Sequence, residues 1–186
     1  GVLLARDTIL NRRVALKIPI VGKHSAEVLE KRFFREAQAA GALESPHVVR
    51  ILDVSKTDAD LPYLVMERLR GNDLAHHLRK RRRLAADKLE TLVREIAGVL
   101  DEASAKGIVH RDIKPQNLFL SERASGTAVW KVLDFGASKL AQNKGTLTEG
   151  RVVGTPAYMA PEQARGHDVT PAADLYALAA IAYRCL

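Results

Sequence analysis

The sequence predicts an α+β fold whose first part is rich in β-strands and whose second part is mainly helical. Short apolar runs bounded by polar turns fill most of the first 70 residues, and one amphipathic helix interrupts them. Gly71 and Asn72 then break the pattern, and helical periodicity dominates the rest of the chain. A chain of 186 residues can bury a real core as one domain or two small lobes. We therefore expect a boundary near residue 70, between 1–70 and 71–186.

Four strands and one helix are predicted in the first part. The apolar runs that predict the strands lie at 2–5, 14–18, 48–54 and 62–67. The helix is predicted over 26–43, because Leu29 and Phe33 belong to an apolar stripe with the spacing of one helix face. Polar residues at 8–13 and 56–60 are typical of the turns between these strands.

Helices are predicted to dominate the second part. Either Asn72 or Asp73 is suited to cap a short helix that runs through Leu78. A longer helix is expected over 87–106, where apolar residues form a wide stripe, and Gly107 is suited to end it.

A hairpin and a final helix follow. The apolar runs 118–120 and 130–133 are expected to pair as an antiparallel hairpin. Residues 137–160 show little periodicity and are predicted to form a long loop, a type of segment that is often functional in compact domains. Thr170 followed by Pro171 is a typical helix start, with the threonine as N-cap.

Composition excludes several classes of protein. The net charge is +7, partly from the run Arg-Lys-Arg-Arg-Arg at 79–83. No aromatic residue interleaves with this run, which favours a solvated helix end, so no nucleic-acid partner is expected. The single cysteine, Cys185, excludes an internal disulfide framework and fits a reducing compartment such as the cytoplasm. The longest apolar run, 175–183, is too short to span a bilayer, so no membrane contact is expected within this chain.

Residues 110–117 read His-Arg-Asp-Ile-Lys-Pro-Gln-Asn and gather an acid, two cations and an amide. Pro115 is incompatible with a helix interior, so the segment is predicted to be a loop with converging polar side chains. The chemistry of Asp112 suits proton abstraction from a hydroxyl, that of Lys114 phosphate binding, and that of Asn117 metal ligation through its amide oxygen. A charged surface turn is the simpler interpretation of His-Arg-Asp alone, but the lysine and asparagine at +2 and +5 from the aspartate disfavour it.

Lys17 lies within the apolar run Val-Ala-Leu-Lys-Ile, where a charge is costly unless it is paired. Glu36 borders the apolar face of the predicted helix and needs a cation in the same way. A pair between Lys17 and Glu36 would account for both residues. The alternatives are that Lys17 points to solvent from an edge strand and that Glu36 pairs with Arg32 along the helix surface.

Two more acids follow or interrupt apolar segments. Asp134 ends the strand at 130–133, and Asp-Phe-Gly is by itself a common turn. The expected hairpin would nevertheless bring Asp134 close to Asn117. Asp174 lies on a strongly apolar helix, so it is expected to accept hydrogen bonds from backbone amides of a neighbouring loop.

These pieces occur in the order of the eukaryotic-like protein kinases, and the chain resembles the serine/threonine kinases of that family found in bacteria. The resemblance covers essentially the whole chain and includes Ala-Arg-Asp at 5–7 and Gly-Thr-Pro-Ala-Tyr-Met-Ala-Pro-Glu-Gln at 154–163. It implies a protein-kinase-like bilobal fold. The N-lobe and hinge would be 1–70, and the partial C-lobe would be 71–186.

The resemblance implies a site for ATP and Mg²⁺, with Mn²⁺ as an alternative metal. Lys17 is implied to bind the α- and β-phosphates, and Glu36 to hold that lysine in place. Asn117 and Asp134 are implied to be the metal ligands, and oxygen donors of this kind suit hard cations.

The resemblance also implies protein substrates with serine or threonine hydroxyls. Asp112 is implied to orient the hydroxyl and accept its proton, while Lys114 steadies the γ-phosphate. Lys114 and the Thr155–Pro156 pair favour serine and threonine over tyrosine, and Thr155 is expected to bond to Asp112 and Lys114.

An adenine pocket is implied as well. Its members would be the gatekeeper Met66, the backbone groups of Glu67 and Leu69, and the apolar side chains of Val2, Ala15 and Phe119. Asp73 is implied to meet the ribose.

Regulation by phosphorylation of the long loop is implied by Arg111, which precedes the catalytic aspartate. A phosphate on Thr146 or Thr148 would bring about −1.5 to −2 charges, and Arg111 and Lys139 are the cations expected to receive it. Autophosphorylation between two copies would require self-association.

Gly1 opens within an apolar pattern and Leu186 closes within a helical one, so both ends are expected to be cut from a longer parent. On this expectation the glycine-rich phosphate loop and the later helices lie outside the chain, as would any membrane anchor of the parent. The main expectation is a serine/threonine protein kinase that also phosphorylates its own loop. The alternative is a kinase-fold binding or scaffold module that lacks phosphoryl transfer in this truncated form.

Overall fold

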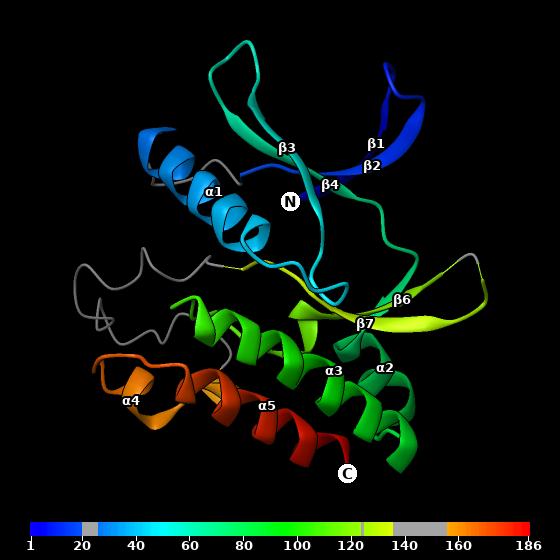
Figure 1. Cartoon of the computed structure of the whole chain (residues 1–186), viewed down its shortest axis with the longest axis vertical. Coiled ribbons are helices and arrows are strands. Elements are labelled where there is room, and N and C mark those ends of the chain that lie inside the picture. The colour runs from blue at the N-terminus through cyan, green and yellow to red at the C-terminus, as the bar shows by residue number, and fades with distance from the viewer. Residues whose placement is uncertain (20–25, 124, 136–155) are drawn as a thin grey trace.

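A computed structural model describes residues 1–19, 26–123, 125–135 and 156–186. The chain forms an upper part, built on a four-stranded sheet, and a lower part, built mainly from helices (Figure 1). The upper part contains β1 (Val2–Asp7), β2 (Arg12–Lys17), α1 (Ala26–Gly41), β3 (Ile51–Lys56) and β4 (Pro62–Glu67). The lower part contains β5 (Gly71–Asp73), α2 (Leu74–Arg81), α3 (Ala86–Ala105), β6 (Leu118–Glu122), β7 (Ala128–Val132), α4 (Pro161–Ala164) and α5 (Ala172–Cys185). The predicted α+β class is confirmed.

The upper sheet is antiparallel, with strand order β1-β2-β4-β3. Lys17 is therefore on an interior strand, and the alternative of a solvent-facing lysine on an edge strand is wrong. Val2 lies opposite Lys17, and Ala15 lies opposite Met66. Opposite residues of an antiparallel pair share a face of the sheet, as do residues two apart on one strand. The register thus places these four side chains on the same face.

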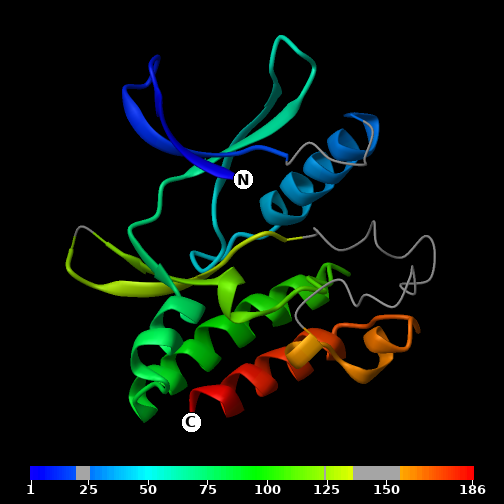
Figure 2. The ribbon, with the colours of Figure 1, turned by 180° about the vertical axis from the view of Figure 1, so that it is seen from behind.

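Helix α1 covers that face of the upper sheet. Its Phe33 is buried in one cluster with Val49, Leu64 and Met66. The helix contacts both β3 and β4, and it lies along the sheet in the view from behind (Figure 2). Glu36 follows Phe33 by three residues, so it also faces the sheet side that carries the lysine.

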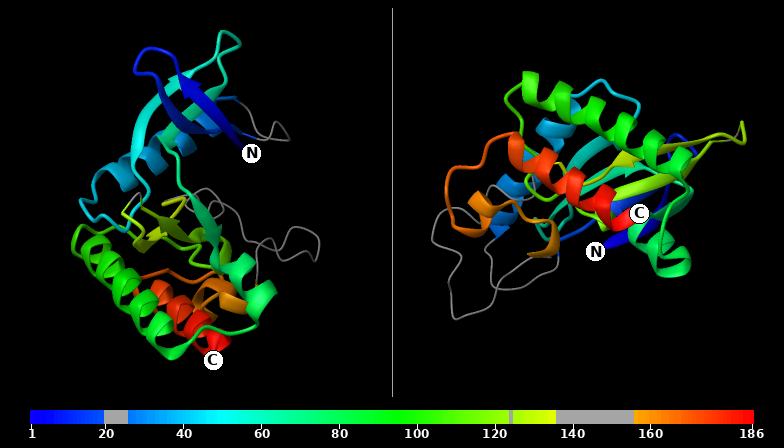
Figure 3. Two further views of the ribbon diagram at one scale, coloured as in Figure 1. Left: turned by 90° about the vertical axis from the view of Figure 1, so that its right-hand side faces the viewer. Right: turned by 90° about the horizontal axis from the view of Figure 1, so that it is seen from below.

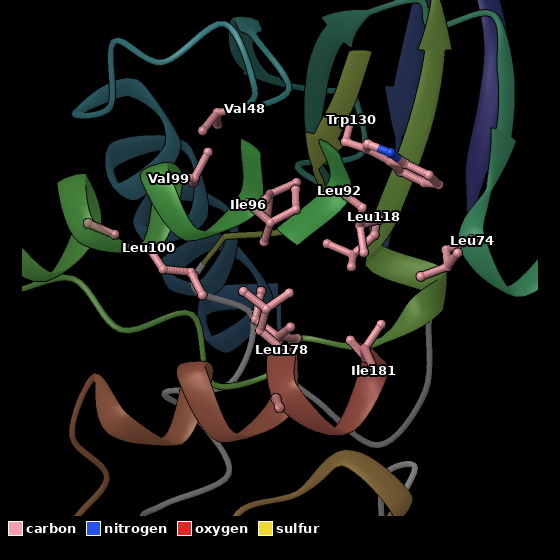
Figure 4. Packing of buried hydrophobic residues seen from close by; sticks show 14 of the residues in the cluster. Val48, Leu74, Leu92, Ile96, Val99, Leu100, Leu118, Trp130, Leu178 and Ile181 are labelled. Carbon is pink, nitrogen blue, oxygen red and sulfur yellow. The ribbon is translucent and has the colours of Figure 1, made fainter. Parts of the chain in front are cut away.

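The core of the lower part lies between α3 and α5. The two helices run side by side (Figure 3). Leu92, Ile96 and Val99 of α3 are fully buried and belong to one cluster with Leu178 and Ile181 of α5 (Figure 4). The wide apolar stripe predicted for the long helix is the face that enters this core. No helix within the described ranges is long and apolar enough to cross a membrane.

A three-stranded antiparallel sheet, in the order β5-β6-β7, joins the lower part to the chain that descends from β4. The predicted hairpin is confirmed as β6 and β7. The break predicted at Gly71 and Asn72 is instead the start of strand β5. Gly71 has a φ of 127°, and a Cβ at this position would collide with the carbonyl oxygen of Leu120 on β6. The same glycine that interrupts the apolar pattern therefore permits the close pairing. The division at residue 70 stays a prediction.

The predicted strand at 48–54 begins later than expected, at Ile51, because its first residues pair with the lower part. The backbone N–H of Val49 donates to the carbonyl of Val132, 3.0 Å away, and Val132 donates to the carbonyl of His47 at 2.7 Å. This segment thus ties the upper part to β7.

The short helix α2 is capped as predicted. Asp73 accepts a hydrogen bond from the backbone N–H of His76, 2.6 Å away. The helix continues to Arg81, three residues beyond the predicted end at Leu78. Arg82 closes the last turn, donating its N–H to the carbonyl of Leu78 at 2.9 Å.

The start of α5 differs from the prediction. Thr170 is not a side-chain cap, because Pro171 occupies the cap position with helical dihedral angles, φ −54° and ψ −23°. The backbone carbonyl of Thr170 accepts the N–H of Ala173 instead, at 3.0 Å. The helix begins at Ala172.

Candidate active site

Asp174 holds the start of the 110–117 loop from below. Its side chain is only 3% exposed, and its two carboxylate oxygens accept the backbone N–H groups of His110 at 2.7 Å and Arg111 at 2.8 Å. The expected bonds from Asp174 to loop amides are confirmed. Burial raises the pKa of Asp174, although His110 and the two amides oppose that rise. Arg111 has a φ of 67°, a left-handed conformation that a non-glycine residue adopts only when its surroundings impose it.

His110 links the loop to the end of β7. It is fully buried, and its ring packs edge-on against Phe135 with centroids 4.8 Å apart. The N–H of Asp112 lies 3.2 Å from Nδ1, so Nδ1 is assigned as the acceptor. The other nitrogen, Nε2, then carries the proton and donates to the carbonyl of Leu133, 2.8 Å away. Sequence patterns give His110 no role, because its ring contacts form only in the folded chain.

Asp112, Lys114 and Asn117 converge within the loop. Lys114 Nζ lies 2.7 Å from Asp112 Oδ2. Asn117 donates from Nδ2 to the backbone carbonyl of Asp112 at 2.7 Å and to Oδ2 at 3.1 Å. The predicted convergence is confirmed. It leaves one carboxylate partly exposed beside a cation, an arrangement suited to receiving a proton from a bound hydroxyl.

A second group gathers around Lys17 at the base of the upper sheet. Lys17 Nζ is 2.6 Å from Glu36 Oε1 and 2.8 Å from Asp134 Oδ1. The glutamate is buried, at 2% side-chain exposure, the lysine is half-buried at 16%, and Asp134 is 35% exposed. The expected pair between Lys17 and Glu36 is present. The bond to Asp134 was not predicted, since 117 residues separate the two in the chain.

The two groups meet at the end of β7. The backbone N–H of Leu133 donates to the carbonyl of Asn117, 2.9 Å away. Asp134 is the next residue, so it lies beside the loop while its carboxylate reaches Lys17. The prediction that the hairpin brings Asp134 near Asn117 is confirmed. A phosphate-sized anion and a cation bound here would contact residues of both parts.

The donor chemistry at this junction fits a hard divalent cation. Asn117 uses its amide nitrogen toward Asp112, so its Oδ1 is the oxygen that could serve as a metal donor, and Asp134 supplies a carboxylate. Within the described ranges, no group of three or more His, Cys, Asp or Glu side chains could hold a metal. Two protein oxygens alone bind Mg²⁺ weakly, so such an ion would also need the oxygens of a bound phosphate.

The predicted adenine-pocket residues are placed unevenly. Ala15 and Leu69 pack against the upper cluster that contains Met66, and so does Leu133, which was not predicted. Val2 shares their face of the sheet but is 62% exposed. Phe119 lies on β6 of the lower sheet, opposite Asp73.

Glu67 makes side-chain contacts that the sequence did not indicate. Its Oε1 accepts the backbone N–H of Arg50 at 2.9 Å and Lys131 Nζ at 2.7 Å. These residues and Leu69 border a cavity of about 750 Å³. Lys17, Asp112 and Asp134 do not line that cavity, so we assign the chemistry to the charged junction and not to this cavity.

The predicted regulatory residues are only partly placed. Lys139, Thr146, Thr148 and Thr155 lie outside the described residues. The carbonyl of Arg111 accepts a hydrogen bond from Gln163 Nε2 of α4 at 2.9 Å. This contact, which local sequence patterns do not indicate, ties the 110–117 loop to α4.

Comparison with known proteins agrees with this geometry. The protein kinase domain family model matches residues 1–186. The chain is 40% identical to the serine/threonine-protein kinase PknE of Mycobacterium tuberculosis over 182 residues, covering 98% of this chain and 31% of the relative. It is 40% identical over 187 residues to the serine/threonine-protein kinase Pkn1 of Myxococcus xanthus, covering 100% of this chain and 27% of the relative. Serine/threonine-protein kinase PknD of M. tuberculosis is 38% identical over 182 residues, with coverages of 98% and 27%.

The chain spans about a third or less of the length of these relatives. It matches them from end to end, through both the upper sheet and the helical lower part. The expected bilobal architecture is thereby confirmed, and this chain belongs to the protein kinase family.

Proposed function

We propose that the chain is the catalytic part of a serine/threonine protein kinase that transfers the γ-phosphoryl group of ATP to serine and threonine hydroxyls of proteins. One observation carries this proposal. The group around Lys17 and the group around Asp112 meet where Leu133 bonds to Asn117. A cation for phosphates and a carboxylate for a hydroxyl thus stand on either side of one junction. Phosphoryl transfer depends mainly on such positioning and charge stabilisation.

Lys17 is the proposed ligand of the α- and β-phosphates. Glu36 is buried against it and would keep the ammonium group in place when phosphates arrive. Asp134 now shares that ammonium group, so a bound triphosphate would compete with Asp134 for Lys17. We propose that Asn117 and Asp134 then hold Mg²⁺, with Mn²⁺ as an alternative. The metal would neutralise phosphate charge.

Asp112 is the proposed acceptor of the substrate proton. A serine or threonine hydroxyl within hydrogen-bond reach of Asp112 would be oriented for attack and would lose its proton to the carboxylate. Lys114, 2.7 Å from that carboxylate, would face the transferring phosphoryl group. The proposed adenine contacts are Met66 and the backbone of Glu67 and Leu69, with Val2, Ala15 and Phe119 as apolar neighbours.

The alternative, a kinase-fold module that binds without transferring, lacks a supporting observation. Such a module would be expected to have lost one of the charged residues at the junction. Lys17, Asp112 and Asp134 are all present, and each contacts a charged partner.

The test is phosphate incorporation from Mg·ATP by the full natural polypeptide that carries this chain. Replacing Asp112 by Asn should lower the rate by about 100-fold or more, because it removes a general base while keeping shape and polarity. Asp101→Asn, at an exposed position on α3, is the matched control and should leave the rate unchanged. Equal incorporation by wild type and Asp112→Asn would refute phosphoryl transfer by this site.

We further propose that the kinase phosphorylates its own loop. The acceptors would be Thr146 and Thr148, the receiving cations Arg111 and Lys139, and Thr155 would contact Asp112 and Lys114. We infer that one copy acts on another in the cytoplasm, so the initial rate should rise with the square of protein concentration. Replacing Thr146 and Thr148 by Ala should abolish activation by preincubation with Mg·ATP. Unchanged activation would refute the proposed regulation by phosphorylation of Thr146 and Thr148.

A further inference from the structure

A second charged surface lies at the far end of α2. Residues 79–83 are five consecutive cations, and all five are exposed. They account for most of the charge imbalance of the chain, because the formal net charge would fall from +7 to +2 without them. Positive charge is therefore concentrated at one corner and not spread over the molecule.

The fold adds a sixth cation to this corner. Arg184 of α5 donates from Nη1 to the carbonyl of Arg82, 2.9 Å away, across 102 residues of sequence. The N–H of Leu84 donates to the carbonyl of Cys185 at 2.8 Å, so the two helix ends are held together (Figure 2). We call 79–83 together with Arg184 the basic corner. Within the described ranges, none of its six side chains forms an ion pair.

Helix stability explains only part of this cluster. Cations in the last turn of α2 interact favourably with the helix dipole, which accounts for Arg79, Lys80 and Arg81. Arg82 and Arg83 lie beyond the helix. Arg82 adopts a left-handed conformation with φ 62°, at the position where glycine is the favoured residue. An arginine here keeps a positive charge at a position where glycine would adopt the left-handed conformation with less strain.

The environment of His77 is consistent with a positive potential at the corner. Burial lowers the pKa of His77, and electrostatic repulsion from His76 and Arg81 lowers it further. The ring of His77 packs edge-on against Trp130 on β7, with centroids 6.1 Å apart. Helix α2, which ends in the basic corner, therefore packs against the three-stranded lower sheet.

We propose that the basic corner is a docking surface for an acidic segment of the protein substrate, a proposal that rests on the proposed kinase function. Guanidinium groups bind carboxylates and phosphates in a planar, two-pronged manner, and the corner offers five of them. No aromatic or aliphatic residue interrupts 79–83, so the run itself offers no side chain for base stacking or for insertion into a bilayer. An acidic protein segment fits these features better than nucleic acid or membrane.

The position of α2 sets the distance between acceptor and acidic segment. The helix starts after Asp73, which lies opposite Phe119, two residues beyond Asn117. Its eight residues extend about 12 Å from there. An extended peptide covers about 12 Å in roughly four residues. The acidic residues should therefore lie about four or more positions from the phosphorylated serine.

The test uses the full natural polypeptide and three fluorescent peptides with one serine. One peptide carries four consecutive glutamates, the last of which stands four residues before the serine. The second carries four consecutive glutamates, the first of which stands four residues after the serine. The third has glutamines at the same positions as the glutamates. The test variant is Lys80→Gln, Arg81→Gln, Arg83→Gln. The matched control is Arg13→Gln, Arg35→Gln, Arg123→Gln, which removes three exposed cations elsewhere. Binding is measured by fluorescence anisotropy and phosphorylation by kcat/KM.

We expect wild type and the control to bind one acidic peptide at least tenfold more tightly than the glutamine peptide, with affinity that falls as salt rises. The test variant should lose this preference in both binding and kcat/KM. Binding without any phosphorylation would refute the proposed kinase function but support the corner. If the test variant phosphorylates the peptides with an unchanged preference for the acidic one, the docking role of the basic corner is refuted. The assignment to a protein segment would also be overturned if wild type bound phosphatidylserine vesicles or a single-stranded oligonucleotide more tightly than the acidic peptides and the test variant lost that binding.

Discussion

The loop at 110–117 and the group around Lys17 are supported in different ways. Within the loop, Asp112 meets partners two and five residues away, and the buried Asp174 and His110 hold its backbone within the lower part. Lys17 instead meets partners 19 and 117 residues away, on α1 and after β7. The first arrangement depends on the core of one part. The second exists only when both parts are correctly placed relative to each other.

This difference shows where precision and adjustability lie in the molecule. Backbone hydrogen bonds to buried groups hold the proposed base in one geometry. Ion pairs between side chains of three separate elements hold the proposed phosphate ligand, and these can exchange partners when a triphosphate arrives. Breaking a support of the loop should therefore cost stability and activity together, whereas breaking a partner of Lys17 should cost mainly activity.

The largest combined effect is expected from Asp174→Ala. It leaves the buried N–H groups of His110 and Arg111 without their acceptors, each worth about 1–3 kcal/mol. We expect a loss of about 3 kcal/mol in the free energy of unfolding, measured with urea, and a loss of about 100-fold in phosphate incorporation because the base is displaced. Asp174→Asn keeps one acceptor oxygen, so its stability and its activity should lie between those of wild type and of Asp174→Ala. A stability of the alanine variant equal to wild type would show that the loop is held in another way.

A smaller and more selective effect is expected from Glu36→Gln. Lys17 keeps Asp134 as a partner, and the variant removes the desolvation cost of a buried carboxylate, so stability should change by less than about 1 kcal/mol. Phosphate incorporation should fall by about tenfold or more, because the ammonium group loses its anchor. Glu30→Gln, on the same helix and in a more exposed pair with Lys56 at 2.9 Å, serves as control. A large loss of stability without loss of activity would contradict the contrast between the two groups.

The smallest effect is expected from His77, which belongs to neither group. Its pKa is lowered below 6.5, mainly by burial, and its Nε2 has no hydrogen-bond partner within the described residues. The unfolded chain therefore binds the proton more readily, so the stability present above pH 6.5 declines as the pH falls below that value. His77→Gln should reduce the drop in Tm between pH 7.5 and pH 5.5, with the exposed His167 replaced by Gln as control. An identical drop in wild type and His77→Gln would exclude this histidine as the cause.

Much of the architecture could be predicted because it follows from local patterns. The periodicity of α3, the cap at Asp73 and the hairpin strands depend on residues close in sequence, and all three appear as expected. The predictions that missed involve pairing between distant segments. Strand β5 forms because Gly71 allows approach to Leu120, and β3 starts late because Val49 pairs with Val132.

The sequence alone determined which chemical groups this protein gathers on one loop, since 110–117 contains an acid, two cations and an amide within eight residues. Only the tertiary structure decided which charges meet. The bond from Lys17 to Asp134, the support of the loop by Asp174 and the arrival of Arg184 at the basic corner join segments 117, 63–64 and 102 residues apart. The packing of α1 on the upper sheet and of α3 against α5 sets those distances, and local sequence patterns do not encode them.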